Sequence, residues 1–352
     1  MTFKQLELFA DNDYRQTKKY QNGTFKTREE IMEIAKKAGK DKIYRVLSFG
    51  GGTQSSHMLE SHFRGEKGYE YDYIIMSDTG AEPDFIHQQV EWWKNRQKFY
   101  GNNTPFIITQ HKSMEGGLEE MLMRYIFRDY QRFQLPLYFN KLTEDGEIVK
   151  GGLMPRQCTG DFKIVPVQQK ARQLIKEELG LKPKQLIPGN IGIIMDIGFS
   201  FDEINRVGGY VSHQSSYIYL SYPLIEKGLS TKDSIQFLVD NNYPSKRSRC
   251  YFCPFNCSGD KGRDIGMEWE EIIRDEPQSF LKACYFDDQL RKVQATGRKN
   301  MRSIPYFHFS RLPLQEVYQK EYEELVTVYS KDMDLWISQW NLFMEQKYPL
   351  VS

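Results

Sequence analysis

The sequence lacks three features that would place the protein in a special class. No apolar run approaches the roughly 18 residues of a membrane-spanning helix. The first residues, MTFKQLELFADNDYRQ, contain no apolar core of a secretory signal. The formal net charge is only +1, so the chain as a whole has no electrostatic attraction for nucleic acid or acidic membranes. We therefore expect a cytoplasmic protein with no membrane-bound part.

Cysteine is scarce, with five residues in a chain of 352, and a cytoplasmic location argues against structural disulfides. Cys250, Cys253 and Cys257 follow the pattern C-x2-C-x3-C, which lets one loop wrap a metal centre. A fourth ligand is needed, and Cys158 is the best candidate. Cys284 lies in a helical pattern and is expected to be a small buried side chain. Histidine is also rare, and no pair of histidines has metal-binding spacing.

Two metals fit this set of four cysteines. Zinc and a [4Fe–4S] cluster both accept four thiolates, so the ligand set alone does not choose between them. Pro254 follows Cys253 directly, which is a pairing seen in ferredoxin-type sequences. The basic residues Lys246, Arg247 and Arg249 precede the cluster and are expected to form a solvated loop.

Short apolar runs alternate with helical patterns along most of the chain. The pattern predicts strands at residues 44–49, 71–77 and 104–109, separated by helices at 53–63 and 85–100. Further on, we expect helices at 27–38, 166–179 and 231–239, strands within 189–199 and 217–224, and C-terminal helices at 269–275, 279–292 and 314–329. Such alternation predicts an α/β fold with a mainly parallel sheet and helices on both faces.

Composition divides the chain into three expected regions. Residues 1–40 form a polar, helical lead-in, and residues 41–243 form the nucleotide-binding core. An aromatic-rich and less regular insertion or lid is expected near residues 116–152 of that core. Residues 244–352 form a helical C-terminal region that carries the cysteine metal site.

A glycine-rich turn follows the first predicted strand in the sequence VLSFGGGTQSSHML. Gly50, Gly51 and Gly52 permit a tight turn and close approach of a ligand to the backbone. Thr53, Gln54, Ser55 and Ser56 then open a helix, whose free N–H groups attract anions. The turn has no Lys, so it does not match the common phosphate loop G-x-x-x-x-G-K-[ST]. It is expected to hold a phosphate with backbone groups and hydroxyls, the alternative being a tight turn without a ligand.

The stretch SFGGGTQSS resembles the pyrophosphate loop S-G-G-x-D-S of the N-type ATP pyrophosphatases. This superfamily has an adenine nucleotide alpha hydrolase-like fold and includes the phosphoadenosine phosphosulfate (PAPS) reductases. It also includes tRNA-thiolation enzymes and the ATPase of DNA phosphorothioation systems. Two positions depart from the pattern, because Gly50 replaces Ser and Gln54 replaces Asp.

Three further motifs occur in the order found in this superfamily. SDTGAEPDF resembles its D-T-G-x-E-x-P element and places Asp78, Thr79 and Gly80 in the nucleotide site. MPRQCTGDFKIVP is similar to R-x-C-T-x-x-x-K-x-x-P, and DIGFSFDEINRV is similar to G-x-x-x-D-E-x-x-R. These two motifs contribute Lys163 and Arg206 as anion-binding residues, with Arg156, Thr159, Pro166, Gly198, Asp202 and Glu203 as the other matching positions.

The resemblance implies an enzyme that cleaves ATP with Mg²⁺ to AMP and pyrophosphate and transfers sulfur, with a [4Fe–4S] cluster on Cys158, Cys250, Cys253 and Cys257. The residues expected to act in catalysis are Gln54, Ser55, Lys163 and Arg206. A sulfur donor such as a cysteine desulfurase and a nucleic acid acceptor are the implied partners. Two alternatives stay open: reduction of phosphoadenosine or adenosine phosphosulfate, and nucleotide binding without turnover in a defence system.

Overall fold

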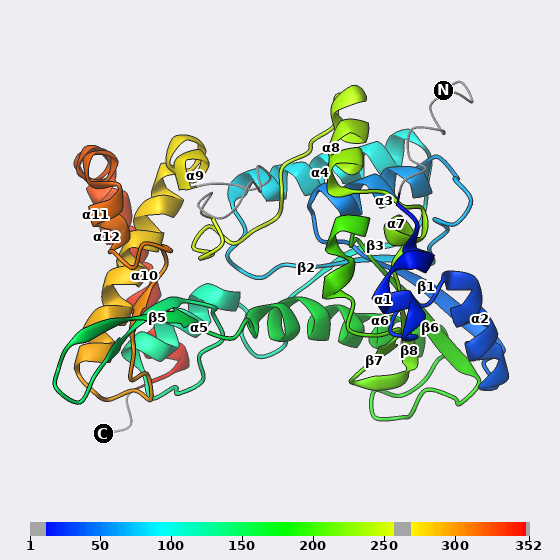
Figure 1. Ribbon diagram of the computed structural model, residues 1–352, viewed down its shortest axis with the longest axis horizontal. Helices are drawn as coiled ribbons and strands as arrows, with labels where there is room; N and C mark the ends of the chain where they lie inside the picture. Colours follow the sequence, from blue (N-terminus) through cyan, green and yellow to red (C-terminus); the bar gives the residue numbers. More distant parts are fainter. Residues whose placement is uncertain (1–11, 257–268, 350–352) are drawn as a thin grey trace. The chain divides into compact units, whose positions relative to one another are not determined.

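The computed structural model describes residues 12–256 and 269–349. These residues form two compact units (Figure 1). The first contains residues 12–77, 85–109 and 166–248, and the second contains the described parts of 78–84, 110–165 and 249–352. Each unit is therefore assembled from three separate stretches of chain. Among the described helices, none is both long enough and apolar enough to cross a membrane.

A six-stranded sheet forms the centre of the first unit. Its described strands are β1 (Lys42–Ser48), β2 (Tyr73–Ser77), β3 (Phe106–Thr109), β6 (Ile191–Ile197), β7 (Val211–Ser212) and β8 (Ser215–Ser221). They lie in the order β3-β2-β1-β6-β8-β7. The pairs from β3 to β8 are parallel, and only the short β7 is antiparallel to its neighbour. This confirms the expected mainly parallel sheet.

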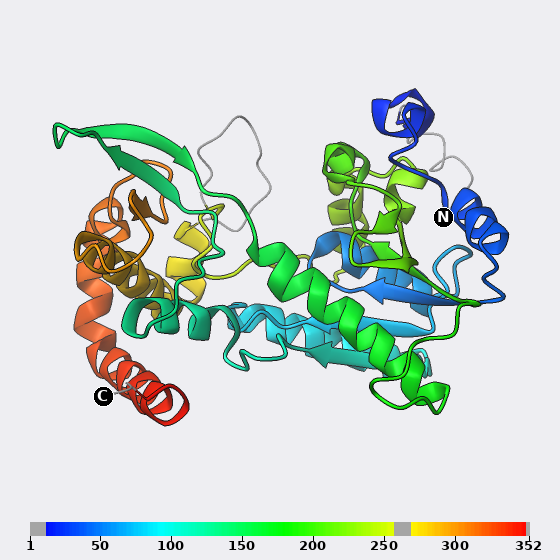
Figure 2. The same cartoon turned by 90° about the horizontal axis from the view of Figure 1, so that it is seen from below.

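Helices cover both faces of this sheet. They are α2 (Arg28–Lys37), α3 (Thr53–Phe63), α4 (Asp84–Phe99), α6 (Val165–Glu178) and α8 (Thr231–Asp240), with the short helices α1 (Lys18–Gln21) and α7 (Pro223–Glu226) and the 3-10 turns Tyr14–Gln16 and Phe201–Arg206. Leu47 and Ile74 pack with α3, α4 and α8 in one buried cluster. Val46 and Ile75 face the other way and pack against α6, which crosses the opposite side of the sheet (Figure 2).

The order of the strands reverses beside β1. The chain moves from β1 outward to β2 and β3, then returns to β6 on the other side of β1. In open α/β sheets, ligands bind at the carboxyl ends of the strands where the order reverses. The predicted glycine turn follows the carboxyl end of β1, so it lies at this position of the sheet.

The second unit combines helices with a small antiparallel sheet. It contains α5 (Gly117–Phe127), β4 (Tyr138–Leu142), β5 (Ile148–Leu153), the π-helical turn Gly160–Ile164, α9 (Trp269–Asp275), α10 (Pro277–Ala295), β9 (Ile304–Tyr306), α11 (Leu314–Val317) and α12 (Gln319–Lys347). The strands lie in the order β5-β4-β9. Phe252 stacks on Phe307 with ring centroids 5.9 Å apart and meets Phe286 edge-on, which ties the cysteine segment to α10.

Residues 116–152 are more regular than the sequence analysis expects. α5 buries Leu118, Met121 and Leu122 at helical spacing, so this part is a core helix of the second unit. β4 and β5 then form a hairpin whose turn contains Gly146 with φ +82°. The D-G pair at this turn is a hairpin signal that the irregular composition obscures. The helical C-terminal region is confirmed for the described residues, although α12 runs 18 residues beyond the expected end, from 329 to Lys347.

Candidate functional site

The glycine loop (residues 50–56) is held by short contacts within itself. Gly51 has φ +70°, a conformation that favours glycine. The Gly50 N–H donates to the Ser55 hydroxyl at 3.1 Å, and that hydroxyl donates to the Gly52 carbonyl at 3.0 Å. Gly52 is the N-cap of α3 and has no side chain that could accept a hydrogen bond. The first N–H groups of the helix, which have no partner within the helix, therefore receive no side-chain cap from this residue. This geometry suits an anion.

Two hydroxyls of the loop have different environments. Thr53 is fully buried, and its hydroxyl donates to the Ser245 carbonyl at 2.9 Å. Ser56 is also fully buried, but its hydroxyl has no hydrogen-bond partner within the described residues. A buried hydroxyl without a partner is costly, because burial removes the water that it would otherwise bind.

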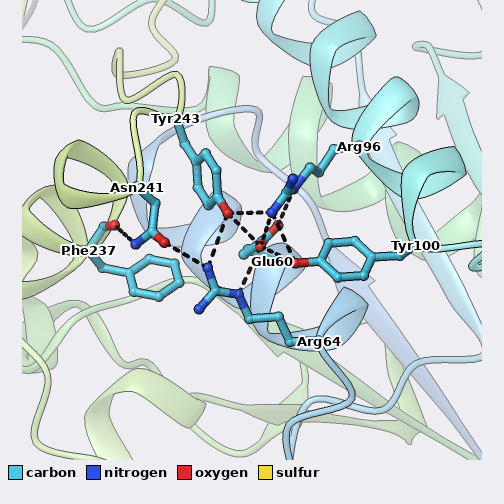
Figure 3. Close-up of polar contacts among 7 residues, drawn as sticks. All are labelled: Glu60, Arg64, Arg96, Tyr100, Phe237, Asn241 and Tyr243. Atoms are coloured by element: carbon cyan, nitrogen blue, oxygen red, sulfur yellow. Dashed lines mark hydrogen bonds and ion pairs between the residues drawn. The ribbon is translucent and has the colours of Figure 1, made fainter. Parts of the chain in front are cut away.

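The helix that carries the loop is anchored by a buried carboxylate one turn before its end. Glu60 of α3 is fully buried, and hydrogen bonds reach it from Arg64 and Arg96 and from Tyr100 and Tyr243 (Figure 3). Burial alone would raise the pKa of Glu60, but these four donors outweigh it and lower the pKa. The carboxylate therefore stays ionised and links α3 to α4 and to the chain after α8.

The amide of Gln54 belongs to a polar network at the start of α3. Its Nε2 donates to the Glu203 carboxylate at 3.3 Å and contacts the Thr231 hydroxyl at 3.2 Å. Thr231 in turn donates to Asp202 at 2.8 Å. Gly198 packs so closely on the same turn that an added Cβ would lie 3.0 Å from the Ser55 nitrogen. Two carboxylates therefore lie next to the position where this chain has Gln instead of Asp.

Arg206 is engaged by the same network. Its guanidinium forms an ion pair with Glu203 and lies 4.2 Å from the centre of the Phe199 ring. Its side chain is still 43% exposed, so a ligand can reach it. The structure thus brings Gln54 and Arg206 together in the first unit through Glu203, whereas Ser55 contacts Gly50 and Gly52 within the loop.

The D-T-G element belongs to the second unit. The Asp78 carboxylate accepts the Gly80 N–H at 2.8 Å, which stabilises its own turn. Gly80 has φ +66°, and an added Cβ would lie 2.7 Å from the Gly116 carbonyl oxygen. The Thr79 hydroxyl donates to Glu82 at 3.1 Å and lies 3.5 Å from the Cys250 sulfur.

Lys163 forms an ion pair with Glu82, which is not among the predicted site residues. Its Nζ lies 3.2 Å from the Glu82 carboxylate, whose side chain is fully buried. Burial alone would lower the pKa of Lys163, but Glu82 and the nearby Cys250 outweigh it and raise the pKa. Lys163 therefore remains a cation at neutral pH. Glu82 lies within the predicted SDTGAEPDF motif, between Thr79 and Pro83. This position in the motif was the sequence signal that could have identified Glu82 as a site residue.

Three of the four predicted metal ligands are described, all in the second unit, and Cys257 lies outside the described residues. The segment with Cys250 and Cys253 is folded as a turn, since the Cys253 N–H donates to the Cys250 carbonyl at 2.9 Å. The Asn256 amide donates to the same carbonyl at 3.0 Å. Burial raises the pKa of the Cys158 and Cys250 thiols, and neighbouring Cys253 raises both further.

These thiols are thus electrostatic neighbours. Within the described part of the chain, no group of three or more His, Cys, Asp or Glu side chains is arranged to hold a metal ion. The choice between iron–sulfur and zinc stays a prediction. Cys284 is 2% exposed inside α10, which confirms that it is a buried side chain.

The predicted site residues are therefore divided between the units, with the glycine loop and Arg206 in the first and residues 78–80, Lys163 and the cysteines in the second. Comparison of the chain with protein-family models and with curated proteins finds no match.

Proposed function

We propose that the protein binds ATP at the glycine loop and cleaves it between the α and β phosphates, as a sulfurtransferase-type enzyme with an iron–sulfur cluster. The observation that carries this proposal is the position of the loop. A glycine turn without Lys lies where the strand order reverses, and it leads into a helix with no side-chain cap. Backbone N–H groups at such a position bind phosphate groups. The resemblance to the N-type ATP pyrophosphatases supplies the reaction.

In this reaction, an acceptor oxygen attacks the α phosphorus, and the bond from that phosphorus to the bridging oxygen breaks. Pyrophosphate leaves with the bonding electron pair, and the acceptor is left carrying AMP. A sulfur nucleophile from a donor protein, such as a cysteine desulfurase, then displaces AMP. N–H groups of the loop stabilise the charge on the departing pyrophosphate. Mg²⁺ bound with ATP would supply further charge neutralisation. A nucleic acid is one acceptor that the resemblance suggests.

The cysteine segment supports the metal part of the proposal by its donor chemistry. Burial raises the pKa of Cys158 and Cys250, the nearby Cys253 raises both further, and a cationic centre would stabilise the thiolate forms of these thiols. Cys257 is the remaining ligand of the proposed set. A cluster held by these residues would deliver sulfur or stabilise the local structure.

A second candidate is nucleotide binding without turnover. The specific observation in its favour is that Gln54 carries no charge and that its amide, like Arg206, is engaged by Glu203. Reduction of phosphosulfates is less well supported, because in the family that reaction needs a mobile cysteine. The remaining thiol, Cys284, is buried in α10.

Incubating the purified protein with Mg²⁺, ATP, a nucleic acid acceptor and sulfide as the sulfur nucleophile distinguishes these functions. Release of AMP and pyrophosphate supports the enzyme, and retention of intact ATP supports the binding component. The matched variants are Gly52→Val and Gly189→Val. A Cβ at Gly52 would lie 3.0 Å from the Ser248 nitrogen, whereas one at Gly189 meets open space. If the wild-type protein neither binds nor cleaves ATP, the glycine loop is not a nucleotide site.

The metal is tested separately on protein purified without oxygen. A brown protein with an absorption band near about 400 nm and bound iron supports the cluster. A colourless protein with stoichiometric zinc would replace the cluster by a structural zinc site.

A further inference from the structure

A basic segment from a distant part of the sequence lies on the glycine loop. This segment comprises residues 245–248, with the sequence Ser-Lys-Arg-Ser, and belongs to the same unit as the loop. The Thr53 hydroxyl donates to the Ser245 carbonyl at 2.9 Å. An added Cβ on Gly52 would lie 3.0 Å from the Ser248 nitrogen and 3.8 Å from the Arg247 Cα. The segment is therefore part of the loop's surroundings. It is a loop, as expected, but its basic residues are half-buried and not fully solvated.

One side chain binds the loop and the basic segment together. Gln89 of α4 is 4% exposed, and its Nε2 donates to the Gly51 carbonyl at 2.5 Å and to the Lys246 carbonyl at 3.2 Å. Its Oε1 accepts the Lys246 N–H at 3.2 Å. Because both ends of the amide are used, the backbone of the segment is fixed in register with the turn. The two basic side chains thus begin at set positions beside the loop.

The basic segment supplies what the loop lacks. Residues 49–56 contain no Lys or Arg, although a nucleoside triphosphate brings about four negative charges. Lys246 and Arg247 are both half-buried, and the Arg247 Cα lies 3.8 Å from a Cβ added to Gly52. The Lys246 ammonium lies 4.3 Å from the centre of the Phe85 ring in the first turn of α4, the helix that also carries Gln89.

We infer that Lys246 and Arg247 provide the positive charge of the nucleotide site by contacting the phosphate groups bound at the glycine loop. The pair takes the role that the Lys of the common phosphate loop has within its own motif. It also defines the ligand class, because two cations beside the loop favour a nucleoside di- or triphosphate over a monophosphate or a free nucleoside. This inference rests on the proposed nucleotide site but does not require that ATP is cleaved.

The experiment is titration calorimetry of the full chain with ATP, AMP and adenosine. The variants are Lys246→Ala, Arg247→Ala and the double substitution. Lys36→Ala is the control, since it removes the same charge from an exposed position on α2. We expect each single variant to bind ATP about tenfold more weakly, and the double variant about a hundredfold. Binding of adenosine should change by less than about twofold, and Arg247→Lys should recover part of the loss.

Folding is checked by hydrogen exchange of α3 in each variant, because a collapsed loop would weaken all three ligands equally. Equal losses for ATP and adenosine, or ATP affinities equal to that of Lys36→Ala, would overturn the inference. Failure of the wild-type protein to bind ATP would overturn both the inference and the proposed function. If the variants lose ATP affinity but the wild-type protein never releases AMP, only the cleavage reaction is overturned.

Discussion

The glycine loop and the cysteine segment differ in how their parts are brought together. The predicted loop residues are consecutive, and a strand end and a helix start are sufficient to shape them. The predicted metal ligands come from residues 158 and 250–257, which are about a hundred residues apart in a unit built from three stretches of chain. All residues of the loop are described, whereas the predicted ligand set includes Cys257, which lies outside the described residues. A motif of consecutive residues can thus be predicted from local sequence, whereas a dispersed ligand set also depends on how the fold brings Cys158 to the other cysteines.

The largest effect is expected at the cysteines. Cys250→Ser and Cys158→Ser should each lose most of the bound metal, because every thiolate of a four-ligand site contributes to holding it. The matched control is Cys284→Ala, which removes a thiol buried in α10 and should retain the full metal content. Metal analysis and absorption spectra give the answer. If Cys158→Ser retained all of its metal, Cys158 would not be a ligand. The metal site would then be formed by residues 250–257 alone.

The next effect compares two glycines, one in each unit. Gly117→Ala should destabilise the protein by on the order of 3 kcal/mol, because Gly117 has φ +59° and a Cβ would lie 2.0 Å from the Thr79 carbonyl oxygen. Gly50→Ala should cost less than about 1 kcal/mol, since its Cβ would make ordinary contact with Ser55 at 3.6 Å. Urea unfolding of both variants tests the difference. Equal losses would mean that the second unit rearranges around the new methyl group.

A smaller effect is expected from pH at the helix that supports the loop. His57 of α3 is buried and stacks on Phe237, and burial lowers its pKa from 6.5 to about 4. Because the pKa of His57 is lower in the folded than in the unfolded state, the unfolded state takes up a proton first as the pH falls. The protein therefore keeps its full stability above pH 6.5 and loses stability as the pH falls toward 4. We expect a loss of about 2 kcal/mol between pH 7 and 4.5. His57→Gln should flatten the pH dependence of hydrogen exchange in α3, and an unchanged profile would contradict this assignment.

The smallest effect concerns the residue that distinguishes this loop from the family pattern. Gln54→Asp should weaken ATP binding about fivefold, because a third carboxylate would join Asp202 and Glu203 and the hydrogen bond to Glu203 would be lost. Gln54→Asn keeps the amide and should change affinity less. Calorimetry with Mg²⁺ and ATP measures both. Tighter ATP binding or faster AMP release by Gln54→Asp would contradict this prediction. It would show that a carboxylate at position 54 improves the site.

Much of the first unit can be predicted from the sequence because its signals are local. The helix from Thr53 to Phe63 and the strand ending at Ser77 have the expected bounds or ends, since glycine turns and apolar runs define them. The hairpin of β4 and β5 is not predicted, because its strands alternate weakly and are mostly exposed. Nor can sequence reasoning find the position of Gln89, because a buried amide that joins two distant segments has no local signature.

The contact between the glycine loop and the basic segment also has a consequence for the order in which the site forms during synthesis. Thr53 and Ser245 are 192 residues apart in the sequence. The hydrogen bond between them can therefore form only after all of these residues have been translated. At typical rates of synthesis, this interval is about 10 to 40 seconds. During that time, the growing chain contains the glycine loop but not the basic segment. If synthesis stopped before residue 245, only the loop's backbone N–H groups and hydroxyls would be available to bind phosphate. In newly made protein, the acquisition of tight nucleotide binding should therefore be a late event that marks completion of the first unit.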